Sequence, residues 1–393
     1  MINVNFSALL LIYISKIRYN HPIKMKRTDI MAKIISFPLS LVFAFLSLFG
    51  VYLPKSEVEI DKENWNTNYT YVFVHGLMGW GEYDAQYKIM PYWGMFGGEL
   101  MSKLNKSGFD CVAASVSGTA SAWDRACELY AQLTGTVTDY GKAHSEEHNH
   151  DRFGKDFTGK RLVSEFDKNH KINLLGHSFG GATIRVFATL MAKGDEAERK
   201  ATPENEISPL FTGGKADYIY SLTTLAAPSN GTTAYSAPSE DKDTAAYDMY
   251  IDNAMELNKR MVTDKNTYYF AIPCSATTKQ DDGTYKADKK IMEGMFRSSA
   301  DEMGAYTGVT QGGFAFDESW LENDGLVNTI SAMAPTSAPS TQYEEGEVVS
   351  GVWNVMPTYR GDHMSLQGGM MKTNVQVHEL YLTHLNMINS LSK

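Results

Sequence analysis

The sequence predicts an α/β protein with a mostly parallel sheet and helices on both faces of that sheet. Short apolar runs rich in β-branched and aromatic residues alternate with stretches of helical periodicity along most of the chain. The 32 glycines suit a fold with many tight strand-to-helix turns. With 393 residues, of which 43% are hydrophobic and 21% charged, the chain can bury a large core.

Each predicted strand is an apolar run bounded by turn residues. In chain order the predicted strands are 69–74, 110–116, 171–177, 218–227, 266–273 and 351–359. Helices are predicted at 95–107, at 181–193, which Gly194 closes, and at 374–390. The Pro/Ser/Thr-rich segment 334–341 is expected to be a loop. Residues 119–156 and 275–319 are polar, do not fit the alternation and are expected to be insertions.

The N-terminal residues 1–53 are expected to be a targeting or membrane segment. Four basic residues precede the uncharged apolar run 34–53, which is how an export signal is built. The run is longer than a usual signal core and long enough to span a bilayer, so it fits a cleaved signal or an uncleaved anchor. The alternative is a buried N-terminal helix. Met25 and Met31 are alternative starts.

The polar residues 54–68 are expected to be a linker, and 69–393 a catalytic domain that is secreted or anchored on the extracellular face. A net charge of −10 argues against nucleic acid as the main partner, while the apolar run 34–53 permits membrane association. The three cysteines do not form a disulfide framework and are expected to be thiols. The oligomeric state is left open.

The segment Gly-His-Ser-Phe-Gly at 176–180 is a G-x-S-x-G motif between a predicted strand and a predicted helix. This motif places a serine on a strained turn at the edge of an α/β-hydrolase sheet, so Ser178 is the candidate nucleophile. The backbone N–H of Phe179, at the start of the helix, can donate to a developing oxyanion. The second donor is expected to be the N–H of Leu77, in the glycine-containing loop after the strand 69–74.

A serine nucleophile needs a histidine base and an orienting carboxylate, which follow the serine in this fold. Three histidines follow Ser178, and two of them lie in the predicted C-terminal helix. His363 follows a predicted strand instead, so it is the candidate base. Asp324, in the turn 320–325 (WLENDG), is the candidate acid. Its rivals on sequence alone are Asp317, Glu322 and Asp362.

Several long strings resemble the zinc-containing lipases of thermoalkaliphilic bacilli and staphylococci. They appear in the order of that family from about residue 69 onward. The matching segments are 74–81 (VHGLMGWG), 123–133 (WDRACELYAQL), 139–141 (DYG), 150–154 (HDRFG), 208–211 (SPLF), 320–325 (WLENDG), and 351–354 (GVWN) running to Asp362-His363. The resemblance implies a catalytic triad of Ser178, His363 and Asp324, and thereby chooses among the acids.

The resemblance also implies a structural zinc site in the segment 119–156, which would be a small helical zinc-binding insertion. The implied ligands are Asp124, His144, His150 and Asp243, with His148 left out. Two imidazoles and two carboxylates form a closed tetrahedral set, which suits a structural ion.

Two departures from the family are expected to matter. Only nine residues separate Thr233 from Asp243, where the family has a long helical lid, so we expect little interfacial activation and a preference for shorter or more soluble esters. The family's calcium ligands correspond to Ser365 and Met370, neither of which is a charged oxygen ligand, so the calcium site is predicted to be absent.

The sequence therefore predicts a serine carboxylic ester hydrolase, a lipase or esterase that acts on lipid or short-to-medium acyl esters. A phospholipase or acyltransferase would use the same acyl chemistry. A zinc-stabilised surface protein that binds lipid or peptide without turnover is a third hypothesis, and it would not react with a probe for activated serines.

Overall fold

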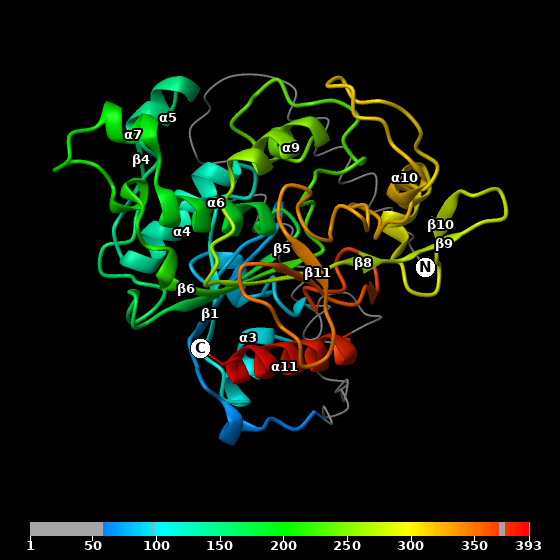
Figure 1. The fold of residues 1–393 in the computed structure, drawn as a ribbon, viewed down its shortest axis with the longest axis horizontal. Helices are drawn as coiled ribbons and strands as arrows, with labels where there is room; N and C mark the ends of the chain where they lie inside the picture. Colours follow the sequence, from blue (N-terminus) through cyan, green and yellow to red (C-terminus); the bar gives the residue numbers. More distant parts are fainter. Residues whose placement is uncertain (1–57, 96–97, 369–373, 393) are drawn as a thin grey trace. The chain divides into compact units, whose positions relative to one another are not determined.

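The computed structural model describes residues 58–392 except 96–97 and 369–373 (Figure 1). The predicted targeting segment 1–53 lies outside these residues. Within the described ranges, no helix is long and apolar enough to cross a membrane.

The centre of the described unit is a seven-stranded sheet in which every neighbouring pair is parallel. In spatial order its strands are β11 (Ser340–Gln342), β12 (Trp353–Val355), β7 (Tyr268–Ile272), β6 (Ile219–Leu225), β5 (Ile172–His177), β1 (Thr70–Val74) and β2 (Cys111–Ala114). The register aligns Val74 with Gly176 and Gly176 with Thr224. The loops that follow these three central strands therefore leave the sheet at the same carboxyl edge.

Alternating side chains of the strands fill two separate cores, one on each face of the sheet. On β1, Val72 and Val74 enter one core, whereas Tyr71 and Phe73 enter the other. This period of two is the geometry of an extended strand buried on both faces. The predicted α/β sheet with helices on both faces is confirmed.

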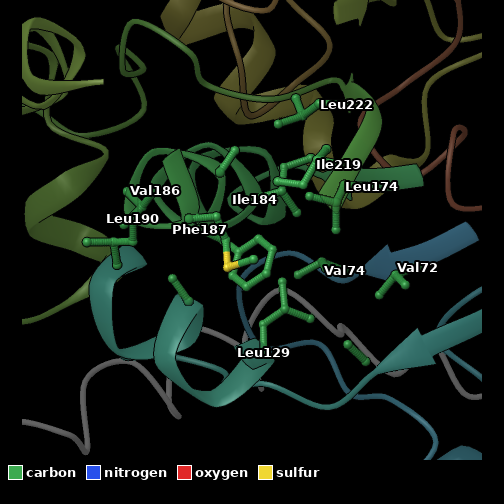
Figure 2. Close-up of a cluster of buried hydrophobic side chains, with 14 of the residues drawn as sticks. Val72, Val74, Leu129, Leu174, Ile184, Val186, Phe187, Leu190, Ile219 and Leu222 are labelled. Atoms are coloured by element: carbon green, nitrogen blue, oxygen red, sulfur yellow. The ribbon is translucent and has the colours of Figure 1, made fainter. Parts of the chain in front are cut away.

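The first core lies between the sheet and the helices α4 (Ala122–Thr134) and α6 (Gly180–Lys193). Figure 2 shows Leu129 of α4 and Phe187 of α6 projecting toward Val74 of β1. Phe187 is fully buried, and burying a side chain of this size contributes about 1.5–3 kcal/mol to the free energy of unfolding.

The second core lies against α3 (Leu100–Lys106) and α11 (Asn374–Ser390). Helix α11 has the predicted bounds. Helix α3 is shorter than the predicted 95–107, because Gly98 has a φ of +84° and a right-handed helix cannot run through it.

The start of the folded domain packs against the end of α11. The backbone N–H groups of Asn66 and Thr67 donate to the carbonyl oxygen of Asn389, at 2.7 and 3.1 Å. The indole N–H of Trp65 donates to Asn386 Oδ1 at 2.7 Å. The second half of the expected linker 54–68 thus belongs to the domain, because its tryptophan finds a partner on the last helix.

The segment 119–156 differs from a simple insertion. Its first part is α4, nine of whose thirteen residues are buried, and which forms one layer of the first core. Only the remainder projects from the scaffold, as β3 (Val137–Asp139), α5 (Lys142–His148) and β4 (Phe153–Asp156).

Residues 275–319 contain more regular structure than the sequence indicates. They include β9 (Thr277–Lys279) and β10 (Tyr285–Ala287), which form an antiparallel pair, and α10 (Arg297–Met303). Strand β8 (Cys274–Ser275) precedes them and pairs with β13 (Tyr359–Arg360). The other helices in the part of the chain that the structure describes are α7 (Glu196–Ala201), α8 (Ala245–Asp248), α9 (Ile251–Arg260), and the 3-10 helices Lys62–Asn64, Ala85–Lys88, Pro209–Thr212, Ala216–Tyr218, Gly294–Phe296 and Glu318–Trp320.

Strand β11 begins at Ser340, within the segment 334–341 that the sequence predicts to be a loop, so that prediction is wrong for the last two residues of the segment. All three residues of β11 are exposed, and the strand pairs with β12 alone. Backbone pairing at the edge of the sheet creates this strand without any apolar pattern in its sequence.

Candidate active site and metal cluster

Ser178 occupies a sharp turn between the end of β5 and the start of α6. Its φ of +54° lies in the left-handed region, which residues other than glycine rarely adopt. A Cβ atom on Gly176 would lie 2.4 Å from the carbonyl oxygen of Gly180, and one on Gly180 would lie 2.2 Å from that of Val74. The two glycines therefore allow the close approach of strand and helix that this turn requires.

The structure brings Ser178, His363 and Asp324 together although they are far apart in the sequence. His363 Nε2 lies 2.8 Å from Ser178 Oγ, and His363 Nδ1 lies 2.8 Å from Asp324 Oδ2. His363 and Asp324 are almost fully buried, with 2% and 0% of their surface exposed. A carboxylate on Nδ1 fixes the tautomer that leaves Nε2 free to accept the serine proton.

Asp324 is held in place by backbone contacts that leave one carboxylate oxygen for the imidazole. Its Oδ1 accepts the N–H groups of Leu326 and Val327, at 3.0 and 2.8 Å. The N–H of His363 donates to the carbonyl oxygen of Asp324 at 2.9 Å, which joins the two loops directly.

The three rival carboxylates have other partners. Asp317 is exposed and accepts from Ser319, and Glu322 accepts from the hydroxyl of Ser275. Asp362 accepts the N–H of Glu293 and the hydroxyl of Ser365. Of the four candidates, Asp324 is the one in contact with His363.

The two amides expected to stabilise an oxyanion flank the serine. Phe179 follows Ser178 directly, and a Cβ atom on Gly76 would lie only 2.7 Å from Ser178 Cβ, so the loop that carries Leu77 approaches the serine closely. Within the described part of the chain, the N–H groups of Leu77 and Phe179 donate no hydrogen bond. Both donors are therefore available for a ligand.

Asp124, His144, His150 and Asp243 form one cluster, with ligand atoms that all lie within 4.8 Å of one another. Asp124 lies in the first turn of α4, the two histidines lie in and just after α5, and Asp243 precedes α8. His148 is not part of the set, although its ring lies 4.5 Å from that of His144.

The spacing and chemistry of the cluster fit a tetrahedral metal ion. His144 Nε2 lies 3.1 Å from Asp124 Oδ1 and 3.3 Å from Asp243 Oδ1, and His150 Nε2 lies 3.4 Å from Asp243 Oδ2. Ligand atoms at bond lengths of 2.0–2.1 Å around tetrahedral zinc are separated by about 3.3 Å. His150 Nε2 and Asp243 Oδ1 are buried without a well-formed hydrogen bond, as expected for atoms that bind an ion. This group could hold a metal such as zinc.

Contacts outside the cluster hold its ligands in place. The ring of Trp123 stacks on that of His144 with centroids 5.1 Å apart, and its indole N–H donates to the carbonyl oxygen of Tyr140 at 2.8 Å. The carboxylate of Glu198 accepts the N–H groups of Ala143 and His144. These contacts fix the orientation of His144 and the start of α5 even when no metal is bound.

Burial lowers the pKa of His144, but hydrogen bonds with Asp124 and Asp243 outweigh burial and raise that pKa to about 9. Without an ion, the cluster is therefore held together by a protonated imidazole between two carboxylates. A metal must displace this proton, so metal affinity should increase with pH.

Ser365, at one position of the family's calcium site, uses its hydroxyl to donate to Asp362 Oδ1 at 3.0 Å. Met370 lies outside the described residues. The absence of a calcium site therefore stays a prediction.

The family model described as "Lipase-like, C-terminal domain" matches residues 67–242 and 235–393, which is most of the chain. The chain belongs to this lipase-like family. It is 30% identical over 370 residues to the lipase of Staphylococcus hyicus, and the match covers 78% of this chain and 55% of that protein. It is 31% identical over 360 residues to lipase 2 of Staphylococcus aureus, and the match covers 76% of this chain and 50% of that protein. The lipase-like chain thus spans about half the length of the curated relatives it matches.

Two solved structures share this fold closely. EstA from Clostridium botulinum has a TM-score of 0.78 and 31% identity, with 86% of this chain and 92% of that chain covered. The Staphylococcus hyicus lipase has a TM-score of 0.73 and 28% identity, with 84% and 98% covered. The family resemblance expected from the sequence is confirmed.

Arg125 is a residue of the lipase-like site that the sequence reasoning missed. It is fully buried and donates to the carbonyl oxygens of His75 and Gly76, just before Leu77. Its guanidinium lies 5.0 Å from the ring centroid of Phe179. Burial lowers its pKa to about 10, so it stays charged at neutral pH. The sequence offered one signal for Arg125, its place beside Asp124 in the family string WDRACE. That string does not reveal that Arg125 contacts His75 and Gly76, about 50 positions earlier in the chain.

Three buried neutral histidines should make the lipase-like domain sensitive to acid. Burial lowers the pKa values of His75, His177 and His384 to about 3, and the unfolded value is about 6.5. Below pH 6.5 the unfolded chain binds more protons than the folded chain, so the stability that these groups contribute is present above 6.5 and is lost as the pH falls toward 3.

We therefore expect the three histidines together to take up nearly three protons on unfolding at pH 5. Glu128 and Asp248 offset part of this uptake, because burial raises their pKa values to about 7 and about 6 and they lose protons on unfolding. The free energy of unfolding, measured by urea titration, should still fall between pH 6 and pH 5. The variant His384→Gln, which removes a histidine whose Nε2 contacts Thr223, should reduce this uptake by about one proton. A slope unchanged by this variant would contradict the assignment.

Proposed function

We propose that the chain is a carboxylic ester hydrolase of the lipase or esterase type that works through an acyl-enzyme. The observation that carries this proposal is the pair of 2.8 Å contacts that join Ser178, His363 and Asp324 in series. The lipase-like family supports ester bonds of lipids as the substrate class.

In the first half of the reaction, His363 Nε2 accepts the proton of Ser178 Oγ as that oxygen bonds to the ester carbonyl carbon. The electron pair of the C=O bond moves onto the oxygen, which the N–H groups of Leu77 and Phe179 stabilise. Asp324 stabilises the imidazolium. The tetrahedral intermediate then expels the alcohol, which takes its proton from His363, and leaves the acyl group on Ser178.

In the second half, water takes the place of the alcohol. His363 accepts a proton from the water, the hydroxide attacks the acyl carbonyl carbon, and the carboxylic acid leaves as the proton returns to Ser178. The same steps with an alcohol in place of water would transfer the acyl group, so the acceptor decides between hydrolysis and transfer.

We further propose that the short connection between Thr233 and Asp243 leaves this site without a large lid. The nine residues between them form turns, bends and irregular loop without a helix or strand. Asn328 holds Thr233 in place, because its Oδ1 accepts the N–H of Thr233 at 2.9 Å. A site of this kind favours short-to-medium or soluble acyl esters over emulsified long-chain lipid.

Zinc is the ion we propose for the cluster of two aspartates and two histidines. Bound there, zinc would supply a structural crosslink and no catalytic chemistry, because four protein ligands leave no open position. The ion would tie α4 and α5 to the chain before α8 through Asp124, His144, His150 and Asp243, and so fix the rim of the site.

We also propose that the protein acts outside the cell, secreted or anchored through residues 34–53.

A fluorophosphonate probe tests the proposed reaction because it labels only a serine activated as a nucleophile. We expect one label per chain, located at Ser178 by peptide mass analysis, and none on Ser178→Ala. Hydrolysis of p-nitrophenyl esters of graded length should then favour short and medium acyl chains. A folded protein that takes no label would refute the proposal and would favour a binding protein instead.

A further inference from the structure

A chain of buried hydrogen bonds connects the loop before Leu77 to the loop that carries His363. The N–H of Gly76 lies 3.1 Å from Tyr92 Oη, and Tyr92 Oη lies 2.7 Å from His177 Nδ1. His177 Nε2 lies 2.8 Å from the carbonyl oxygen of His363. Tyr92 and His177 are buried, with 4% and 0% of their surface exposed.

The direction of every bond in this chain is fixed by the donors available. The carbonyl oxygen of His363 can only accept, so neutral His177 carries its ring proton on Nε2 and donates it to that oxygen. His177 Nδ1 is then an acceptor, and Tyr92 Oη donates its single proton to it. The backbone N–H of Gly76 donates to the same hydroxyl oxygen.

The hydroxyl of Tyr92 therefore occupies the position at which a second proton would bind His177. Burial holds the pKa of Tyr92 well above its usual value, so this hydroxyl keeps its proton. The ring centroids of His177 and His363 are 4.9 Å apart. A charge on His177 would oppose the imidazolium that forms on His363 during the reaction.

The groups that face His177 are consistent with a neutral ring. Burial lowers its pKa to about 3, and the neighbouring His363 and His75 contribute in the same direction. Arg125 adds a positive charge behind His75. Trp93 packs on His177 edge-on, with centroids 6.1 Å apart, and brings no charge.

We propose that Tyr92 is a positioning residue, whose hydroxyl bridges the N–H of Gly76 and Nδ1 of His177 and thereby couples the oxyanion loop to the His363 loop. The proposal rests on the proposed ester hydrolysis. Tyr92 touches neither substrate nor the reacting atoms, and it acts through Gly76 on one side and His177 on the other. Both loops must be aligned at once for the proton transfer and the oxyanion contacts to coincide.

The test is the variant Tyr92→Phe, which removes one oxygen and keeps the ring. We expect kcat for a p-nitrophenyl ester to fall about 10–100-fold with KM within about twofold, because the transition state is misaligned while substrate contacts remain. The ¹⁵N shift of His177 Nδ1 should move toward that of a nitrogen without a hydrogen-bond donor, while Nε2 keeps the proton that the carbonyl oxygen of His363 accepts. A purely structural role would reduce the folded fraction and would leave kcat of the folded protein unchanged.

The matched control is Tyr83→Phe, which removes a hydroxyl that donates to the carbonyl oxygen of Lys160 at the surface. It should keep the wild-type kcat and the ¹⁵N shift of His177 Nδ1. If Tyr92→Phe does not fold, His177→Gln and His177→Ala replace it. The glutamine can still donate to the carbonyl oxygen of His363, so its kcat should exceed that of the alanine variant.

Wild-type kcat in folded Tyr92→Phe would overturn the inference, as would equal kcat values in the two His177 variants. If Ser178→Ala is inactive in the same assays, such a result leaves the proposed function standing. If Ser178→Ala is active, the proposed function itself has failed.

Discussion

Replacing Ser178 with alanine should lower kcat for a p-nitrophenyl ester by about 10⁴-fold or more, because no other group can form the acyl-enzyme. The fold should survive, since alanine fits the space of the serine and the turn keeps its glycines. Initial rates on purified protein, with circular dichroism to confirm folding, provide the measurement.

Ser298→Ala is the control, since Ser298 is exposed on α10. It should retain full activity. The double variant Ser178→Ala with His363→Ala should be no less active than Ser178→Ala alone, because the two side chains act as one unit. Appreciable activity in Ser178→Ala would refute the mechanism, and additive losses would mean that the 2.8 Å contact has no catalytic role.

Removal of the metal should have the second-largest effect, this time on stability. Elemental analysis should find one zinc per chain, and exhaustive chelation should lower Tm by about 5–10 °C, because binding energy at a structural site is folding energy. His150→Ala should lose the metal and show a similar Tm without chelator. Zinc added back after chelation should restore the original Tm.

His170→Ala provides the matched control for the metal. His170 also lies between two carboxylates, 2.8 Å from Glu165 and 3.1 Å from Asp167, but it is half exposed and outside the cluster. This variant should keep its zinc and its Tm. A wild-type protein purified without stoichiometric metal and indifferent to chelators would refute the site.

The sequence predicts most of the fold because strand signals are local. Residues 70–74 alternate between two cores in a way that their apolar, β-branched composition already indicates. Strand β11 could not be predicted, because its exposed residues form a strand only through pairing with β12. The sequence places helix α4 in an insertion because several of its residues are polar. Its buried face is formed only when α6 packs against it, which the sequence does not show.

For the site, contiguous motifs were more informative than distant partners. Ser178 follows from one pentapeptide with its flanking strand and helix. Asp324 could not be separated from Glu322 by residue type, and only the coordinates or the family resemblance choose between them. Tyr92 left no signal at all, because its role depends on a contact with His177 across 85 residues.

The contact of Asn66 and Thr67 with Asn389 places both ends of the described domain at the amino edge of the sheet. Ser178 lies at the opposite, carboxyl edge, one residue beyond β5. A tether joined to either end of the described domain would therefore attach at the edge of the sheet opposite Ser178. Immobilisation on a bead through a tag fused directly to residue 58 or to residue 392 should leave the turnover of a soluble ester unimpeded.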